Sequence, residues 1–280
     1  MVERMCLVGV LAFGPCVTAA LAQDDAAEGR SQIDALRKHL EQSVHWYEFV
    51  VAGREKPLQP RIVLRWDNQV RGTGSAVGLT VVWTDDTRPQ AIAAIYPWYG
   101  TLNHECDLLA REANVLAKRD GRIVWEAKET GIEFRDVPDA PPPAKTASRR
   151  RLQLKQLAGR FEATMLGWVA DNSDRQELRM LPQWLYRYGR EGADCMDGAI
   201  FAYVMGTDPE AALLLEAYRT DDGDYRWQYA FVRRTSGGLE ARLDGEVVWN
   251  AEKLPIGTDP SRPHLTFSEP LPPRLVPSAD

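Results

Sequence analysis

The feature that most constrains the fold is a short Asp-Gly hairpin that occurs twice. It reads LAKRDGRIVW at residues 116–125 and EARLDGEVVW at residues 240–249, so the two copies lie 124 residues apart. Asp-Gly favours a two-residue turn, because both central positions of that turn take positive φ. Each copy therefore predicts a strand, a tight turn and a second strand that ends in tryptophan.

Further segments repeat upstream of the hairpins. GLTVVWTDDTRP (78–89) aligns without a gap with GAIFAYVMGTDP (198–209), 120 residues later, and RIVLRW (61–66) matches PQWLYRY (182–188). The two spacings differ by four residues, which a longer turn in the second copy, TDDGD (220–224), explains. This order of segments predicts a tandem duplication. The alternative is one continuous α+β domain whose hairpins only look alike.

Each set of strands follows a helical pattern, in which apolar residues recur at steps of three and four. Ser31, three residues before Asp34, is the expected start of the first helix. The apolar positions are Leu36, Leu40, Val44, Tyr47 and Val51 in the first copy, and Leu154, Leu157, Phe161, Met165 and Trp168 in the second.

We therefore expect an α+β fold in which each copy is one helix followed by about six strands. The connections are too short for crossover helices, so neighbouring strands should form an antiparallel meander. Residues 225–232 alternate aromatic with polar or small side chains, which indicates a sheet with one apolar face. The helix of each copy is the nearest cover, so we expect it to pack on a curled sheet.

Composition divides the chain into five parts. Residues 1–22 are predicted to be a signal peptide, and residues 31–135 and 149–255 are the two α+β copies. A proline-rich linker covers residues 136–148, and a proline-rich tail of irregular structure is expected over residues 256–280.

The first 22 residues predict export. Residues 5–22 carry no charge, and Ala20-Leu21-Ala22 has the small-x-small pattern that precedes signal peptidase cleavage. Gly14-Pro15 shortens the apolar centre, which suits a signal better than a retained membrane anchor, the alternative interpretation. We expect a mature chain that begins at Gln23, has no membrane span and is periplasmic or extracellular.

Charge and cysteine content restrict the partners. The formal net charge is −6, which argues against nucleic acid, because phosphate binding requires clustered Lys and Arg. The longest basic run, Arg149–Arg151, is expected to be the solvated start of the second helix. Signal cleavage leaves Cys106 and Cys195, and the sequence does not decide whether they are bridged.

The second copy also carries a resemblance. LPQWLYRY (181–188), GAIFAYVMGTDPEAALLLEA (198–217) and EARLDGEVVW (240–249) resemble a family of exported proteins from planctomycete bacteria that has no assigned activity. The likeness covers the second copy well and the first copy loosely. It implies export and the two-part layout, and it brings no catalytic residues.

Few residues match a known chemistry. His39 and His45 are six positions apart and lie on different faces of the first helix, so no metal site is expected. His104 and Cys106 share one face of a predicted strand and point in parallel, so a half-buried cysteine beside a surface histidine is expected rather than a catalytic dyad. RGTGSAVG (71–78) is expected to be a flexible loop, not a phosphate cradle. We predict no catalytic residue, no metal and no cofactor.

One carboxylate stands out, Glu216 within the apolar run ALLLEAY (212–218). A lone buried carboxylate is costly, so we expect an ion pair with Arg226 or Arg187, or else a side chain that faces a ligand. The first copy has Tyr96 at the equivalent position. The candidate ligand-binding residues are Glu216, Tyr218, Tyr186 and Trp184.

The leading hypothesis is a non-catalytic binding or interaction module of the periplasm or cell envelope, with an envelope protein or a glycan as the expected partner. One alternative is a hydrolase whose site lies between the two copies, which would require residues such as Glu216, Asp197 and His104 to converge. A second alternative is a carrier that holds a small apolar ligand between helix and sheet.

Overall fold

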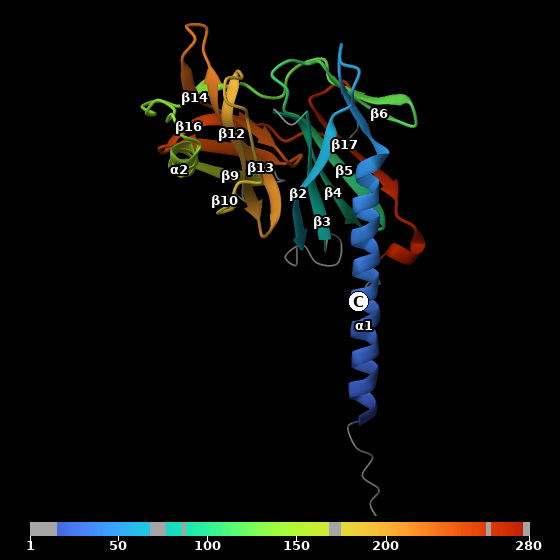
Figure 1. Cartoon of the computed structure of the whole chain (residues 1–280). Helices are drawn as coiled ribbons and strands as arrows, with labels where there is room; N and C mark the ends of the chain where they lie inside the picture. The colour runs from blue at the N-terminus through green and yellow to red at the C-terminus, as the bar shows by residue number, and fades with distance from the viewer. Residues whose placement is uncertain (1–15, 68–76, 86–87, 168–174, 256–258, 277–280) are drawn as a thin grey trace, which may run out of the picture.

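The computed structural model describes residues 16–67, 77–85, 88–167, 175–255 and 259–276 (Figure 1). The described chain forms two helices and three antiparallel sheets, one of them a curled half-barrel. The predicted α+β class is therefore confirmed, with antiparallel strands dominant. The predicted signal peptide lies largely outside the described residues, as do Trp168 and most of RGTGSAVG.

The first half begins with the long helix α1 (Cys16–Ser43), a 3-10 turn (Val44–Trp46) and the short strand β1 (Glu48–Val51). Four strands follow as a meander: β2 (Gln59–Asp67), β3 (Val77–Thr84), β4 (Pro89–Trp98) and β5 (Thr101–Leu108). The hairpin of β6 (Val115–Arg119) and β7 (Arg122–Glu126) then pairs back onto β1.

The second half begins with α2 (Ala147–Ala158) and β9 (Phe161–Gly167). Its strands are β10 (Gln176–Met180), β11 (Tyr186–Tyr188), β12 (Cys195–Met205), β13 (Asp208–Arg219) and β14 (Tyr225–Arg233). The hairpin of β15 (Gly238–Leu243) and β16 (Glu246–Ala251) pairs back onto β9, as the first hairpin does onto β1.

The two hairpins have the predicted turns and the same register. Asp120 and Asp244 have φ of 50° and 51°, and the glycine after each also has positive φ. Trp125 pairs with Ala117, and Trp249 pairs with Ala241. In both hairpins a β-bulge follows that pair, so the 124-residue spacing holds at the level of individual backbone partners.

The central strands match in the same way. Trp83 pairs with Ala91 across β3 and β4, and Tyr203 pairs with Ala211 across β12 and β13. A register shift follows each of these pairs. The 120-residue spacing therefore also applies to the pairing of these strands, including the position of the irregularity.

The predicted helices were wrong at several of their ends. α1 starts at Cys16 rather than Ser31, and α2 ends at Ala158, so Phe161 and Met165 lie in β9. Val44, Tyr47 and Val51 likewise lie beyond the end of α1, in the 3-10 turn, its C-cap and β1. Residues four positions apart lie on the same face of a helix and also on the same face of a strand. The apolar pattern therefore could not distinguish a helix from a strand at these positions.

The tail and the strand number also differ from the prediction. The tail contains β17 (His264–Pro270), which pairs with β5 along its whole length, and a short 3-10 helix (Pro273–Leu275). Its prolines flank the strand or end it at a sheet edge, where a missing donor is tolerated. At the linker, β8 (Arg135–Asp136) pairs with β14. The described halves have seven and eight strands rather than about six.

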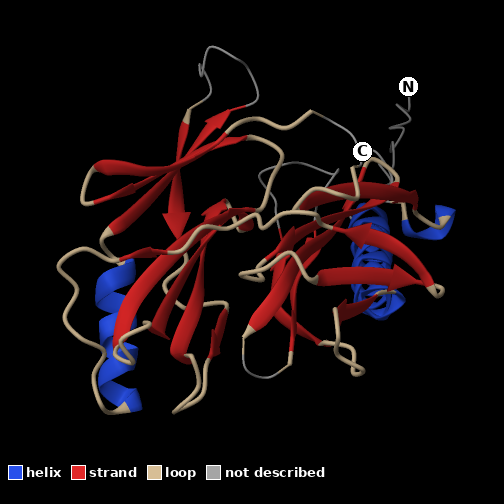
Figure 2. Cartoon of the chain, turned by 90° about the horizontal axis from the view of Figure 1, so that it is seen from above, coloured by secondary structure: helices blue, strands red, loops and turns tan. Residues whose placement is uncertain are grey.

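Three apolar cores result from this arrangement. One lies between α1 and the first-half strands, and one lies between α2 and the second-half strands. The third core joins the two sheets through the faces that point away from the helices, and we call this interface the seam. Its buried residues include Val82 and Ile92 from the first half and Ile200, Leu214 and Val232 from the second. The helices consequently lie on the outer sides, with the sheets between them (Figure 2).

We predict that Trp125 and Trp249 are framework residues. Trp125 is 1% exposed and donates Nε1–H to the Arg262 carbonyl at 2.7 Å, whereas Trp249 is half-buried and stacks on Phe231. Trp125→Ala should lower the free energy of unfolding by about 3–5 kcal/mol, and Trp249→Ala by less. Chemical denaturation measures both. Ile123→Ala on the same hairpin is the control, because this side chain is exposed; a Trp125→Ala variant as stable as the control would contradict the prediction.

Candidate functional site

Glu216 lies at the centre of the seam and is fully buried. It shares a strand face with Ala212 and Leu214, which belong to the seam core. Its carboxylate accepts Nε–H of Arg88 at 2.7 Å and Nη2–H of Arg111 at 2.8 Å, and both arginines come from the first half. The hydroxyl of Tyr188 donates to the same carboxylate at 2.7 Å. The two halves are therefore joined by a buried ion cluster.

The expectation of an arginine partner for Glu216 is confirmed, but the predicted partners were wrong. Arg226 pairs with Asp222 at 3.0 Å, and Arg187 pairs with Asp197 at 2.6 Å. Both predicted partners belong to the second half and are close to Glu216 in sequence, whereas the observed partners belong to the first half. No spacing in the sequence indicates that residues more than 100 positions away complete the pair.

The cluster fixes the ionisation of its members. Burial would raise the pKa of Glu216, but the guanidinium groups of Arg88 and Arg111 outweigh it and hold the pKa below the ordinary carboxyl value. Burial, followed by the adjacent Glu216 charge, raises the pKa of Tyr188 well above its ordinary value. The cluster is consequently a carboxylate, two guanidinium ions and a neutral phenol.

Arg111 is held by aromatic stacking as well as by charge. Its guanidinium carbon lies 3.8 Å from the ring centre of Phe134 and 3.6 Å from that of Tyr218. Its Nη2 also donates to Gln228 Oε1 at 3.1 Å. Cation–π contacts on partly desolvated arginines are favourable, so these contacts help to fix the orientation of this side chain.

The ring of Tyr188 packs directly over Gly198, where no side chain is in the way. A Cβ atom there would lie 2.7 Å from Cε2 of Tyr188 and 3.2 Å from the Leu215 carbonyl oxygen. The first half has the same device, because Gly78 is covered by the ring of Trp66. Each half therefore packs an aromatic ring of one strand directly over a glycine of the next.

A cleft of about 330 Å³ opens beside the cluster, and we call it the seam cleft. It is bordered by residues of both halves: Arg54, Arg88, Arg111, Glu112 and Asn114 from the first, and Asp194, Cys195 and Tyr218 from the second. Within the described part of the chain, three buried polar atoms of these residues have no hydrogen-bond partner: Arg88 Nη2, Arg111 Nε and Asn114 Oδ1. Buried polar atoms are rarely unpaired, so this concentration makes the cleft the candidate functional site.

The predicted site residues separate into two groups. Glu216 and Tyr218 lie at the seam, and Tyr186 lies there too, with its ring stacked on Tyr188. Trp184 instead packs against the core beneath α2, where Lys155 contacts its ring. Arg88 and Arg111 were missed, and the only local signal was that Arg88 immediately precedes a strand that carries no charge.

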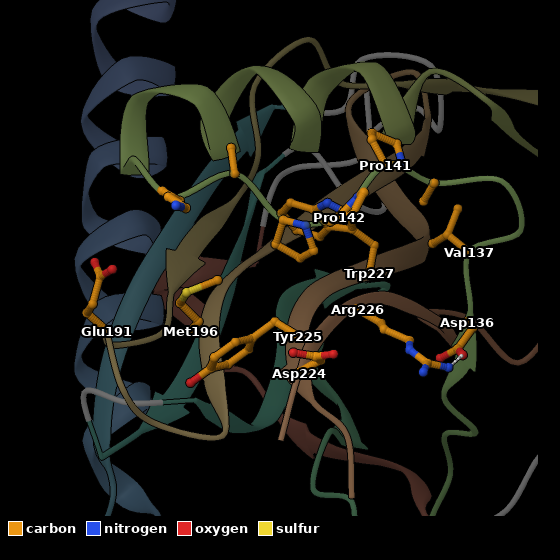
Figure 3. Close-up of a pocket in the computed structure, with 14 residues that line it drawn as sticks. Asp136, Val137, Pro141, Pro142, Glu191, Met196, Asp224, Tyr225, Arg226 and Trp227 are labelled. Atoms are coloured by element: carbon orange, nitrogen blue, oxygen red, sulfur yellow. Dashed lines mark ion pairs between the residues drawn. The ribbon is translucent and has the colours of Figure 1, made fainter. Parts of the chain in front are cut away.

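A second and larger cavity, about 640 Å³, lies beneath the linker, and we call it the strap cavity (Figure 3). The linker prolines Pro141 and Pro142 lie on one side, and Met196, Tyr225 and Trp227 lie on the other. The linker is thus ordered and packed over the sheet rather than extended in solvent.

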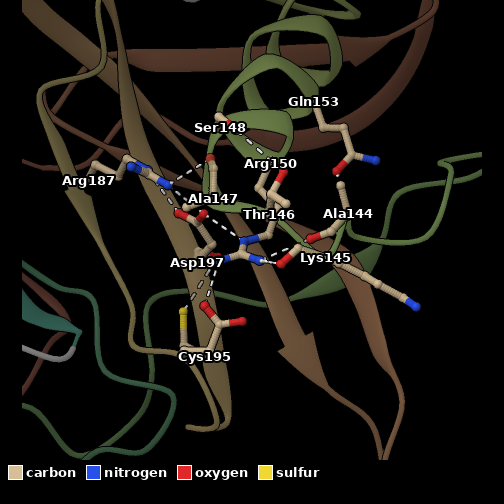
Figure 4. A network of polar contacts seen from close by, with 11 residues as sticks. Ala144, Lys145, Thr146, Ala147, Ser148, Arg150, Gln153, Arg187, Cys195 and Asp197 are labelled. Atoms are coloured by element: carbon tan, nitrogen blue, oxygen red, sulfur yellow. Dashed lines mark hydrogen bonds and ion pairs between the residues drawn. The ribbon is translucent and has the colours of Figure 1, made fainter.

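The linker is held by a buried ion pair (Figure 4). Asp197 accepts from Arg150 at 2.9 Å and from Arg187 at 2.6 Å. Arg150 also donates to the carbonyl oxygens of Ala144 and Lys145, at 3.0 and 3.1 Å. Arg150 is 2% exposed, so the basic run is not solvated throughout, contrary to the prediction.

The residue set suggested for a hydrolase does not converge. Asp197 pairs with Arg150 of α2, whereas Glu216 pairs across the seam. His104 is 1% exposed in the core beneath α1, where its ring stacks on Phe267, so it is not a surface residue. Burial raises the pKa of Cys106, on the same strand, to about 12, which disfavours a thiolate.

A different polar chain occurs at the edge of the seam, and we call it the relay. Asp107 Oδ1 lies 2.7 Å from His264 Nδ1, and His264 Nε2 lies 3.1 Å from Thr266 Oγ1. Arg234 forms a buried ion pair with the other oxygen of Asp107. His264 borders two cavities, of about 410 and 170 Å³, and Thr266 borders the smaller one.

Several absences hold for the residues that the structure describes. They contain no cluster of three potential metal ligands. No described helix has the length and apolar character needed to span a membrane. Cys106 and Cys195 are both free and buried. Comparisons with known proteins returned no matching family model, no matching curated protein and no matching solved structure.

We predict that Glu216→Gln destabilises the protein by about 3–5 kcal/mol, because two guanidinium groups lose their buried counter-ion. The pKa of Glu216 is lowered in the folded state, so its contribution is complete above the ordinary value of 4.5 and is lost as the pH falls below it. The variant should therefore lose less stability than wild type on acidification. Denaturation at several pH values measures this. Glu133→Gln, which breaks an exposed pair with Arg135, should leave stability unchanged, and equal effects of the two substitutions would refute the role of the seam.

Proposed function

We propose that this protein is an exported binding module whose ligand site is the seam cleft. The observation that carries the proposal is that Arg88 and Arg111, two residues that border the cleft, each hold a buried N–H group without a hydrogen-bond partner. Small-molecule sites are usually concave and pre-formed, with a few fixed polar groups. The stacking of Arg111 and the ion pair of Arg88 supply that fixed geometry without a ligand.

We also propose that the two halves arose by tandem duplication. The matched registers and bulges of the hairpins and the central strands support this. The glycine-aromatic pairs Gly78–Trp66 and Gly198–Tyr188 add support from side-chain packing. Duplication explains why the cleft lies where it does, because it creates an interface between two sheets of similar shape.

Export to the periplasm or the cell surface is part of the same proposal, and the uncharged segment ending at Ala22 supports it. The ligand would then be a peptide or a glycan of the cell envelope. Membership of the planctomycete family that the second copy resembles is an expectation consistent with this location.

We predict that a ligand of the seam cleft raises the melting temperature of the mature protein and that Arg54→Ala removes this shift. Arg54 borders the cleft but lies outside the Glu216 cluster, so the fold should tolerate the change. Arg226→Ala is the matched control, since its side chain is equally exposed and borders the strap cavity instead. A thermal-shift screen of a small-molecule library provides the measurement. If the hits are lost in Arg226→Ala and kept in Arg54→Ala, the ligand site is the strap cavity and the proposal fails.

A second candidate function, hydrolysis, is favoured by one observation, the relay Asp107–His264–Thr266. A carboxylate, an imidazole and a hydroxyl in this order match the connectivity by which a base activates a nucleophile. This candidate retains a site between the two halves but uses residues other than those first suggested.

For this candidate we predict that an alkyl fluorophosphonate labels Thr266 covalently. The product should be found by peptide mass mapping, should vanish in Thr266→Val, and should form about a hundredfold more slowly in His264→Gln, because the base is missing. Ser268→Ala, on the same strand face, serves as the control and should label normally. Absence of label on Thr266 in the folded protein eliminates the hydrolase.

A further inference from the structure

The charges of the seam cleft are sorted by depth. Among its basic side chains, Arg88 is 9% exposed, Arg111 is 26% exposed and Arg54 is 54% exposed. The acidic residues at the cleft, Glu112 and Asp194, are both exposed, and the side chain of Asp194 is 76% exposed. The floor of the cleft is therefore cationic. Its mouth carries two acidic side chains, Glu112 and Asp194, and one basic side chain, Arg54, whose charge is balanced by an ion pair with Asp85; Arg219 approaches Asp194 only at 3.8 Å.

The floor suits a single carboxylate. Two guanidinium groups share one counter-ion, Glu216, so one positive charge is left over next to the cleft. Arg88 Nη2 and Arg111 Nε are the donors without a partner, and guanidinium N–H groups match the planar geometry of a carboxylate. A dianion is less well matched, because Glu112 and Asp194 would repel the second charge.

The mouth suits an ammonium group. Asn114 Oδ1 is buried without a hydrogen-bond partner among the described residues and can only accept. Its amide nitrogen, Nδ2, donates to Glu112 Oε2 at 3.4 Å, so the acceptor oxygen and the Glu112 carboxylate lie in one local group. Two carboxylates and one amide oxygen form the acceptor set that an ammonium ion requires.

We propose that the seam cleft binds a zwitterion, a small molecule with an α-amino acid group or a short peptide with free ends. The carboxylate lies against Arg88 and Arg111, and the ammonium group lies against Asn114, Glu112 and Asp194. The volume of about 330 Å³ is at the lower end for small-molecule sites, which fits one or two amino-acid residues. This inference rests on the proposed function of the same cleft and specifies its ligand.

Isothermal titration calorimetry of the mature protein tests the proposal with five probes: alanine, alanyl-alanine, acetate, ethylammonium and inorganic phosphate. Alanine or alanyl-alanine should bind at least about tenfold more tightly than acetate or ethylammonium, because only the zwitterions satisfy both ends of the cleft. If alanine binds more tightly than alanyl-alanine, the ligand is a single amino acid; if alanyl-alanine binds more tightly, the ligand is a peptide. Phosphate as the tightest probe, or acetate as tight as alanine, overturns the zwitterion.

Two variants assign the ends of the ligand. Glu112→Gln should weaken the zwitterion by about two- to fivefold, as expected for an exposed ion pair, and leave acetate binding unchanged. Arg54→Gln removes a basic side chain that borders the cleft, so it should weaken the binding of both the zwitterion and acetate. Melting temperatures establish that each variant is folded. A loss of acetate binding in Glu112→Gln contradicts the assigned orientation.

The failure of this inference and the failure of the proposed function are distinguishable. If none of the five probes binds but a library compound gives a thermal shift that depends on Arg54, the cleft is a ligand site and only the zwitterion is wrong. If no compound gives such a shift and no probe binds, both proposals are wrong.

Discussion

The arrangement of the two halves depends on one buried carboxylate. Glu216 has no access to water and lies among alanine and leucine side chains, so its charge is tolerable only while Arg88 and Arg111 face it. Any docking of the sheets that displaced either arginine would leave an unpaired ion in an apolar interface, at a cost of several kcal/mol. The apolar contacts of the seam stabilise the interface without fixing how the two sheets are placed. The ion cluster, in contrast, is complete in only one relative position of the two sheets. The same cluster leaves guanidinium edges unpaired beside an open cleft, so docking specificity and the candidate ligand site have one origin.

The two halves make different contacts around their glycine-aromatic pairs. In the first half Trp66 covers a glycine and packs near Tyr96, with ring centres 5.9 Å apart. In the second half the corresponding aromatic residue, Tyr188, covers a glycine and donates a hydrogen bond to Glu216 instead. Tyr96 and Glu216, which lie 120 positions apart, therefore differ in role: Tyr96 makes an aromatic contact within its half, and Glu216 anchors the interface. Buried ion pairs cross between the halves in both directions, because Arg234 of the second half pairs with Asp107 of the first.

The features that could be predicted from the sequence are those that depend on local residue patterns. The Asp-Gly turns and the tryptophan in the second strand of each hairpin depend on neighbours within a few residues, and both are present. The alternation along residues 225–232 holds only as far as Tyr229, because Ala230 and Val232 on the other face are buried in the seam. The ends of the helices were wrong because Phe161 and Met165 satisfy helical and strand periods equally. The arginine partners of Glu216 and the strand at residues 264–270 were missed for another reason. Both depend on contacts between segments separated by more than 100 positions, which leave no periodic signal in a single chain.

Strand β17 has a consequence for how the protein reaches its folded form. It completes the sheet of the first half, yet it comes from the last part of the chain. Until it is synthesised, strand β5 keeps an open edge, and the polar side chains Asp107 and Asn103 lack their partners His264 and Ser268. The first half therefore remains incomplete during synthesis and closes only when the whole polypeptide is present.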